Sequence, residues 1–124
     1  ESFAYLLKEN IPAARSNLFS AITGKFDLIV CNPPYLPLEK KEDAESRVAT
    51  TGGKKGDEII LKFLKQAPKH LAKKGIILMV LSSLTYKKSI YKFLQKQSLQ
   101  HEVIDSQTFF METIEVWKIY RLSE

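Results

Sequence analysis

The sequence predicts an α/β fold built on a parallel sheet, and two observations carry that prediction. Residues 26–31 end in a continuous apolar tail and residues 76–81 are apolar throughout, as expected of strands that are buried on both faces. A helical pattern lies between them at residues 58–67, and another follows at residues 86–97. Strands that alternate with helices in this way are typical of parallel sheets with crossover connections.

The first half of the chain supplies one of these strands. An amphipathic helix is expected over residues 2–10 and a short strand over residues 13–17. The apolar strand at 26–31 ends where Pro33 and Pro34 follow, because proline has no N–H with which to continue a central strand. The polar segment 38–57 is long for a connection, which predicts a lid, a binding loop or a disordered segment.

The second half supplies the other elements. After the helix at 58–67, a second helical piece is expected to begin at Pro68 and to stop at Gly75. Ser82 and Ser83 follow the strand at 76–81, where they either belong to a site or cap the next helix. The helix at 86–97 is expected to bury one face and to turn its lysines outward. Its predicted buried residues are Tyr86, Ile90, Phe93 and Leu94, and its outward lysines are Lys87, Lys88, Lys92 and Lys96.

The chain closes with two alternating segments, residues 101–106 and 115–122, which are expected to pair antiparallel at the C-terminal edge of the sheet. Its 124 residues, 44% of them hydrophobic, suit a single domain or a part of one. The domain prediction is that residues 1–124 form the C-terminal portion of a single domain. The chain opens on Glu1 in the middle of a helical pattern, which suggests a fragment or a processed product.

Composition also bears on location and partners. The single cysteine, Cys31, allows no intrachain disulfide, no metal-ligand cluster is visible, and an intracellular, cytoplasmic setting is expected. No apolar run reaches the roughly 20 residues of a membrane span, so no membrane partner is expected. Residues 1–60 carry eight Lys and Arg against nine Asp and Glu, a net charge of −1. Residues 61–124 carry eleven against five, a net charge of +6. The basic half suits nucleic acid or an acidic partner, although a solvated lysine surface is the simpler interpretation.

The segment Asn32-Pro33-Pro34-Tyr35 is the candidate catalytic site. Ligands of open α/β sheets bind at the carboxyl ends of the strands, where Asn32 is expected to emerge. Its side-chain oxygen and the Pro33 carbonyl are two acceptors that suit a planar NH2 group, one for each N–H. They would orient the nitrogen for methyl transfer and stabilise the positive charge that develops on it. Tyr35 would supply a flat face, and the alternative is that the four residues form only a stiff turn.

Other reactive or aromatic side chains have simpler interpretations. Cys31 is expected to be a small core residue rather than a nucleophile. His70 and His101 lack partners at a telling spacing, so surface or strand-end positions are expected. The three aromatic residues near the C-terminus are more readily core residues than the lining of a substrate groove. They are Phe109, Phe110 and Trp117.

The residues 26–37, FDLIVCNPPYLP, resemble the core of class I methyltransferases that modify an exocyclic or amide nitrogen. Further along, Gly52-Gly53-Lys54-Lys55-Gly56-Asp57-Glu58 and the strand that ends at Ser82-Ser83 are similar to the HemK/PrmC branch. Within that branch the similarity is to the archaeal and eukaryotic subgroup, from about Leu6 to the end of the chain. The resemblance implies a Rossmann-like sheet and an S-adenosyl-L-methionine-dependent enzyme that methylates protein glutamine on N5.

The resemblance also implies partners and site residues. The substrate would be the glutamine of the Gly-Gly-Gln loop in a class I peptide release factor, and a small zinc-binding activator subunit would cover a hydrophobic edge. Asn32, Pro33, Pro34 and Tyr35 would take the catalytic positions, with Asn32 also near the cofactor. In the family, an acidic residue contacts the adenine amine of the cofactor, and an apolar pair follows that residue. Asn17 and Leu18 fall at the start of this pattern. Asn17 is a departure from it, because asparagine stands where the family has an acidic residue.

A larger departure concerns the cofactor-binding strands of the family. None of the five glycines forms a Gly-x-Gly turn after a strand, so the sheet is expected to be incomplete, with the strand at Leu28 as an exposed apolar edge. This chain alone is therefore expected to bind cofactor poorly, to be inactive, and to associate with itself through that edge. Two alternatives stay open, an N6-adenine methyltransferase acting on DNA or RNA and a degenerate scaffold that only pairs with a partner subunit.

Overall fold

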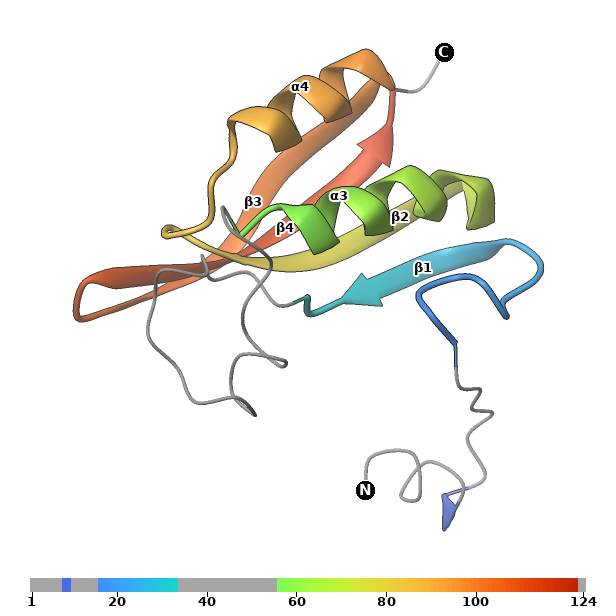
Figure 1. The fold of residues 1–124 in the computed structure, drawn as a ribbon, viewed down its shortest axis with the longest axis horizontal. Coiled ribbons are helices and arrows are strands. Elements are labelled where there is room, and N and C mark those ends of the chain that lie inside the picture. The colour runs from blue at the N-terminus through green and yellow to red at the C-terminus, as the bar shows by residue number, and fades with distance from the viewer. Residues whose placement is uncertain (1–7, 10–15, 34–55, 123–124) are drawn as a thin grey trace.

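The structure is a computed structural model that describes residues 8–9, 16–33 and 56–122. The predicted helix at 2–10, apart from its last turn, and most of the predicted strand at 13–17 lie outside these residues, as does nearly all of the polar segment 38–57. The described chain forms a four-stranded sheet with two helices and a short 3-10 turn (Figure 1). Its elements are β1 (Phe26–Cys31), α3 (Glu58–Gln66), η1 (Ala67–His70), β2 (Leu71–Ser82), α4 (Lys88–Lys96), β3 (Leu99–Phe109) and β4 (Glu112–Arg121).

The strand order is β1-β2-β4-β3. β1 and β2 are parallel, and α3 with η1 forms the crossover between them, which confirms the predicted α/β arrangement. β4 lies between β2 and β3 and pairs antiparallel with both. The closing antiparallel pair is therefore confirmed, with the last strand of the chain inserted beside β2 rather than at the rim of the sheet.

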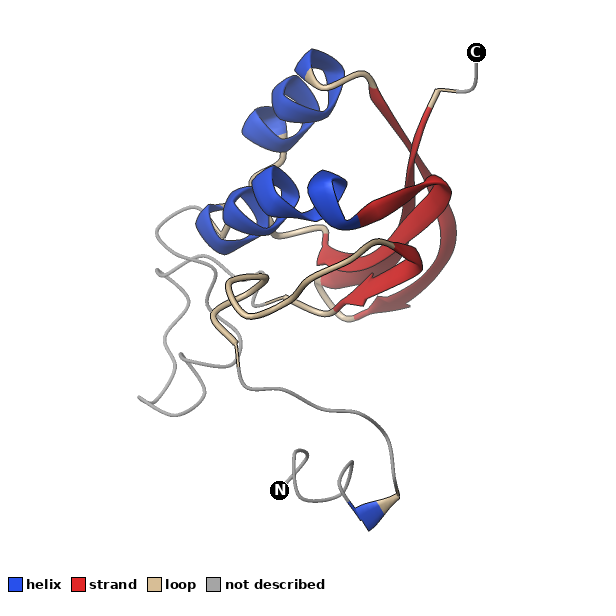
Figure 2. Ribbon diagram, turned by 90° about the vertical axis from the view of Figure 1, so that its right-hand side faces the viewer, coloured by secondary structure: helices blue, strands red, loops and turns tan. Residues whose placement is uncertain are grey.

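One face of the sheet carries the helices and the core (Figure 2). Alternate residues of β2 and β4 point to this face, where they meet the apolar sides of α3 and α4. The residues that are almost completely buried there are Ile60, Leu64, Ile77, Met79, Leu81, Ile90, Leu94, Trp117 and Ile119. Of the residues predicted for the buried side of α4, Ile90 and Leu94 are confirmed, whereas Tyr86 lies before the helix and is 39% exposed.

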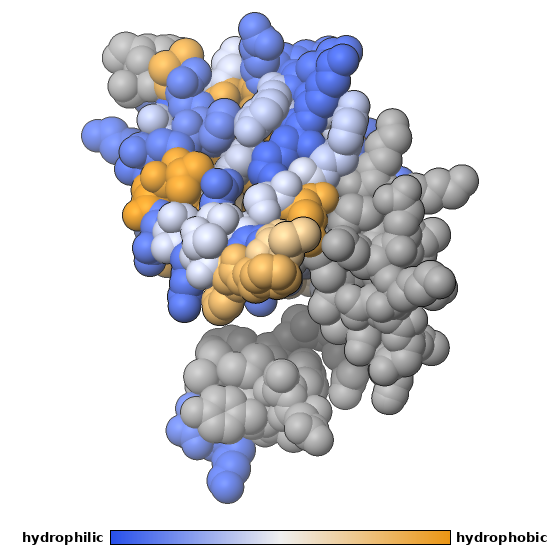
Figure 3. Space-filling model, turned by 90° about the vertical axis from the view of Figure 1, so that its left-hand side faces the viewer, coloured by the Kyte–Doolittle hydropathy of each residue, from blue (hydrophilic) through white to orange (hydrophobic). Residues whose placement is uncertain are grey.

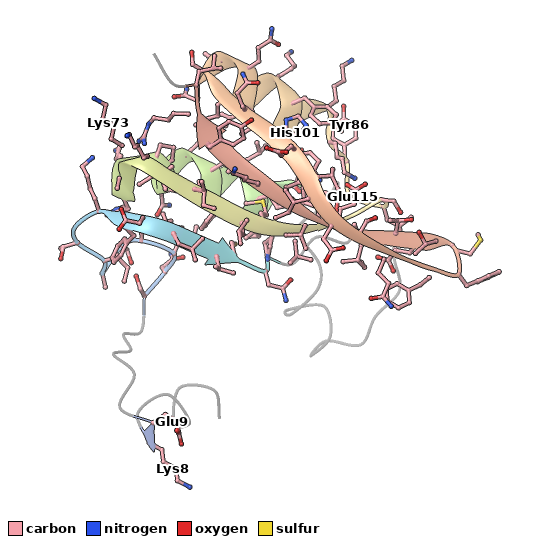
Figure 4. All side chains as sticks on the ribbon, turned by 180° about the vertical axis from the view of Figure 1, so that it is seen from behind. Lys8, Glu9, Lys73, Tyr86, His101 and Glu115 are labelled. Atoms are coloured by element: carbon pink, nitrogen blue, oxygen red, sulfur yellow. The ribbon has the colours of Figure 1, made fainter. Side chains whose placement is uncertain are left out.

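The opposite face of the sheet has no described helix over it (Figures 2 and 4). Leu28 and Val30 of β1 point to that face and are 52% and 66% exposed. The prediction that β1 is buried on both faces is therefore wrong for the described chain. Among the described residues β1 is the outermost strand and pairs with β2 alone, so the prediction of an exposed apolar edge at Leu28 is correct for this part of the chain.

The connection before β2 also differs from the prediction. The helical piece at Pro68 is a single 3-10 turn that ends at His70, and β2 begins at Leu71, so Gly75 lies inside the strand rather than at a helix end. A side chain at Gly75 would come within 2.9 Å of the Phe26 carbonyl oxygen. Glycine is therefore required at this position because the start of β1 passes so close to β2.

No helix in the described part of the chain has the length and apolar character needed to cross a membrane. Among the same residues, no three His, Cys, Asp or Glu side chains are grouped so as to hold a metal ion.

Candidate active site

The carboxyl ends of β1 and β2 lie side by side because the two strands are parallel neighbours. Asn32 follows β1 directly and is exposed, whereas Pro33 is buried. Pro34 and Tyr35 lie outside the described residues. The structure thus places Asn32, exposed to solvent, at the edge where open α/β sheets bind their ligands. The catalytic roles of Asn32, Pro33, Pro34 and Tyr35 stay predictions.

The end of β2 is fixed by two serines that hold the start of β4. Ser82 is completely buried, and its hydroxyl donates to Glu112 Oε2 at 2.6 Å. The Ser83 hydroxyl accepts the Thr113 backbone N–H at 3.0 Å, and the Ser83 N–H donates to the Thr113 carbonyl at 2.8 Å. α4 begins without a side-chain cap, so the expectation that either serine caps it is wrong.

Lys87 belongs to the same polar cluster, although it was predicted to point outward. Its ammonium donates to the Ser82 carbonyl at 2.6 Å and to the Thr85 carbonyl at 3.2 Å. Partial burial lowers the pKa of Lys87, and the negative charge of Glu115 opposes that shift. Neither Lys87 nor Glu112 was singled out from the sequence, because Lys87 resembles the three surface lysines that follow it and Glu112 lies in no recognisable motif.

A second polar contact joins the two helices at the same end of the sheet. Gly56 has φ +81° and precedes Asp57, which is 4% exposed and stands just before α3. The Ser89 hydroxyl, in the first turn of α4, donates to Asp57 Oδ2. Because α3 starts the crossover from β1 to β2, its N-terminus lies at the carboxyl edge near Asn32. Gly52 and Gly53, which belong to the same glycine-containing motif, lie outside the described residues.

The predicted cofactor contacts, Asn17 and Leu18, lie in a turn before β1. Leu18 has φ +58° and is partly buried against the core. The next residue, Phe19, donates its N–H to Gln66 Oε1 at 3.1 Å and stacks on His70 at 4.7 Å. Those contacts are with the end of α3 and with η1, which precede β2, so the structure does not bring this turn to Asn32. Cofactor contact through Asn17 and Leu18 stays a prediction.

The other reactive side chains have structural surroundings. Cys31 is partly buried against the core, and burial raises the pKa of its thiol from 9.0 to about 11, which disfavours the thiolate. His70 Nδ1 lies 3.0 Å from the Gly24 carbonyl oxygen. The His101 ring stacks on Trp117 at 4.4 Å, near the side of the sheet that α4 covers (Figure 4). These surroundings agree with the structural roles expected for all three residues.

The aromatic residues near the C-terminus divide into two groups. Trp117 is 1% exposed and its indole N–H donates to Glu115 Oε1 at 2.9 Å, so the predicted core role is correct. Phe109 and Phe110 are 51% and 93% exposed, so the same prediction is wrong for them. They end β3 and start the turn into β4, where no described element of the chain covers them.

Comparison with known proteins gives the family. The family model described as Eco57I restriction-modification methylase matches residues 4–113. A protein named as an N5-glutamine methyltransferase in Methanocaldococcus jannaschii is 39% identical over 102 residues, which are 81% of this chain and 52% of that protein. The chain thus spans about half the length of this relative.

Other relatives have similar names. A ribosomal protein uL3 glutamine methyltransferase of Xanthomonas campestris is 33% identical over 63% of this chain and 28% of its own length. A release factor glutamine methyltransferase of Pseudomonas aeruginosa is 38% identical over 60% of this chain and 29% of its own length.

A solved structure has the same fold. It is the Mtq2–Trm112 complex of E. cuniculi, which is described as responsible for the methylation of the eRF1 translation termination factor. It matches with a TM-score of 0.67 at 20% identity, over 93% of this chain and 66% of the matched chain. The fold is therefore that of class I methyltransferases. The chain belongs to the Eco57I restriction-modification methylase family, and its HemK/PrmC-type homologues are named protein N5-glutamine methyltransferases.

Proposed function

We propose that the protein containing this chain methylates the side-chain amide of a protein glutamine. The observation that carries the proposal is the position of Asn32, which is exposed and directly follows β1 at the carboxyl edge of the parallel strands. An amide side chain held at that edge by a buried proline is suited to receive a planar NH2 group. The names of the sequence relatives support the same acceptor.

The chemistry asks for acceptors rather than for a strong base. The lone pair of an amide nitrogen is delocalised, so the nitrogen is a poor nucleophile until it is oriented. The Asn32 side-chain oxygen and the Pro33 carbonyl would each accept one N–H of the substrate amide. These hydrogen bonds strengthen as positive charge develops on the nitrogen, so they stabilise the transition state more than the ground state.

The methyl donor proposed for the whole protein is S-adenosyl-L-methionine, which supplies an electrophilic methyl group when it is bound. The fit of this chain to that cofactor is incomplete. Its glycines form no Gly-x-Gly turn after a strand, and Asn17 and Leu18 stand in a turn at the amino ends of β1 and β2. The described residues therefore support the acceptor side of the site.

For the substrate, we favour a class I release factor over a ribosomal protein. The release factor relative supports this choice, as does the termination factor that the Mtq2–Trm112 complex is described as methylating. Translation also takes place in the cytoplasmic setting proposed for this protein. The matched structure is a complex of two proteins, which supports a small activator subunit as a partner. Because one relative is named as a methyltransferase of ribosomal protein uL3, uL3 is the matched alternative substrate in an assay.

A second candidate is methylation of adenine N6 in nucleic acid. The family model takes its description from a restriction-modification methylase, and residues 61–124 carry a net charge of +6. The flipped base would present its NH2 group to the same two acceptors. Methyl incorporation into DNA or RNA but not into protein would replace the first proposal with this one.

The test is methyl transfer from labelled cofactor by the whole protein with its activator, using release factor, uL3 and DNA as acceptors. Replacing Asn32→Ala removes one acceptor, and kcat should fall about 100- to 1,000-fold. Asn32→Asp is the matched control for shape. It keeps an acceptor oxygen at the same position, so it should retain more activity than Asn32→Ala. Full activity of Asn32→Ala on release factor would overturn the proposed role of this residue.

A further inference from the structure

The turn between β3 and β4 carries two large apolar residues at its tip. Phe109 pairs with Glu112, so the hairpin turns through Phe110 and Met111 alone, and these two are 93% and 77% exposed. Two-residue hairpin turns favour Asn, Asp and Gly because they need a positive φ. Met111 has φ +69°, a strained value for its residue type. Strain and exposure together indicate a surface that is kept for contact with another molecule.

The base of this hairpin is held firmly at the proposed site. Its anchors are the Ser82–Glu112 hydrogen bond and the paired bonds between Ser83 and Thr113 described above. The tip therefore projects past the end of β2, at the carboxyl edge of the sheet where Asn32 lies (Figure 1). Figure 3 looks at this end of the molecule and shows a hydrophobic patch on it.

Charge distinguishes this hairpin from the rest of the basic half. Asp105, Glu112 and Glu115 lie toward the tip, and residues 97–117 contain no Lys or Arg, whereas Glu102 lies farther along the ladder, opposite Lys118. All eleven Lys and Arg of residues 61–124 lie outside that stretch. A cavity of about 280 Å³ beside the tip is lined by Asp105, Ser106, Gln107, Phe109, Ile114 and Val116. An acidic, apolar surface repels a phosphate backbone and complements a polypeptide that carries basic and apolar side chains.

We propose that the β3–β4 hairpin tip is the docking surface for the polypeptide substrate, and that it binds a basic, apolar segment near the methylated glutamine. This inference rests on the proposed function. It adds that protein substrates are selected over nucleic acid by the hairpin, while Asn32 receives the amide itself. Phe110 and Met111 act in binding and take no part in the chemistry.

The double variant Phe110→Ser/Met111→Gly tests the inference in the whole protein with its activator. Glycine accepts the positive φ at position 111, so the fold should be retained. The KM for intact release factor should rise at least tenfold, because the apolar contact is lost. The kcat on a short Gly-Gly-Gln peptide that is too small to reach the tip should stay unchanged. Met111→Gly alone is the matched control that keeps Phe110, and its KM should change much less.

Asp105→Lys tests the charge separately. It should raise the KM for release factor and weaken binding of a Lys-rich Gly-Gly-Gln peptide, but not of a Glu-rich one.

An unchanged KM in the double variant would overturn the inference, as would equal losses of activity on release factor and on the short peptide. A double variant that binds DNA more weakly but binds release factor as the wild type does would also overturn the inference. If the wild-type protein methylates no glutamine at all, both the proposed function and this inference fail. If Asn32→Ala lowers kcat on release factor while the double variant leaves the KM for release factor unchanged, the proposed function stands and the hairpin inference falls.

Discussion

At the scale of single residues, the polar groups at the carboxyl edge of the sheet differ in burial and in whether they are hydrogen-bonded to neighbouring elements. Asn32 is exposed and available to a ligand, whereas Ser82 and Asp57 are buried and engaged with the neighbouring elements. Buried polar groups must be hydrogen-bonded, so these two contribute to the shape of the edge rather than to its chemistry. Ser82 and Asp57 thus help to fix the elements that meet at this edge, where we propose that Asn32 acts as the acceptor.

Cys31 precedes Asn32 and gives a prediction at the same scale. Because burial raises the pKa of its thiol to about 11, its thiolate fraction at pH 8 should be about 100-fold lower than that of a thiol with the ordinary value of 9.0. Alkylation by iodoacetamide at pH 8 should be slower by a similar factor than at an exposed position. The comparison is Cys31→Ser/Gln97→Cys, which places the thiol in an exposed turn. Equal alkylation rates of the two proteins would show that Cys31 is not protected.

At the scale of elements, one side chain ties the end of β4 to the crossover connection. The guanidinium of Arg121 donates to the Pro68 carbonyl at 2.7 Å, to the Ala72 carbonyl at 3.0 Å and to the Leu71 carbonyl at 3.2 Å. The fork of N–H donors suits three carbonyls in a way that the ammonium of lysine does not. Arg121 thereby fixes η1 and the start of β2 against the last strand.

Removing that fork should destabilise the fold. Arg121→Met keeps the aliphatic stem but leaves the carbonyls without their charged donor, so the free energy of unfolding should fall by about 1.5–3 kcal/mol. Arg121→Lys should lose less, since one ammonium can still reach one or two of the carbonyls. Urea denaturation measures both, with Lys73→Met on the exposed part of β2 as the control. An Arg121→Met protein as stable as the wild type would contradict the prediction.

The elements also show what sequence patterns can predict. The strands at 26–31 and 76–81 and the helix at 58–67 were predicted because their periodicity is local. The start of β2 was missed because a glycine before an apolar run indicates a helix end, whereas Gly75 is required by the approach of Phe26 on another strand. The turn at Phe110 and Met111 was missed because it contains none of the residues that mark hairpin turns.

The same distinction applies to the candidate site. Asn32 was placed correctly at the carboxyl edge because a strand pattern ends just before it. The contacts among Ser82, Glu112 and Lys87 join residues up to 30 positions apart, so no local pattern could predict them. A sequence pattern can thus locate a residue that directly follows a strand. It cannot predict which residues from distant parts of the chain form contacts at that edge.

At the scale of the whole molecule, the two sides and two rims of the sheet differ in character. One face is covered by α3 and α4, and on the other face no described element lies over Leu28 and Val30. The β3 rim carries Glu102 and Asp105, which discourage pairing with another strand. The β1 rim is uncharged from Leu28 to Cys31. The apolar rim is therefore the side on which this chain is open to a further strand.

We therefore expect the 124-residue chain on its own to associate through β1, with two copies pairing their rims antiparallel about a twofold axis. Val30→Lys places a charge in the middle of β1 and should shift the population toward monomer, because twofold pairing of β1 would bring the added charges of the two copies close together. Glu102→Lys on the opposite rim is the matched control and should leave the association unchanged. Multi-angle light scattering over a range of concentrations measures the effect. A wild-type chain that stays monomeric throughout, or a Val30→Lys chain that associates as strongly as the wild type, would show that β1 is not the pairing edge.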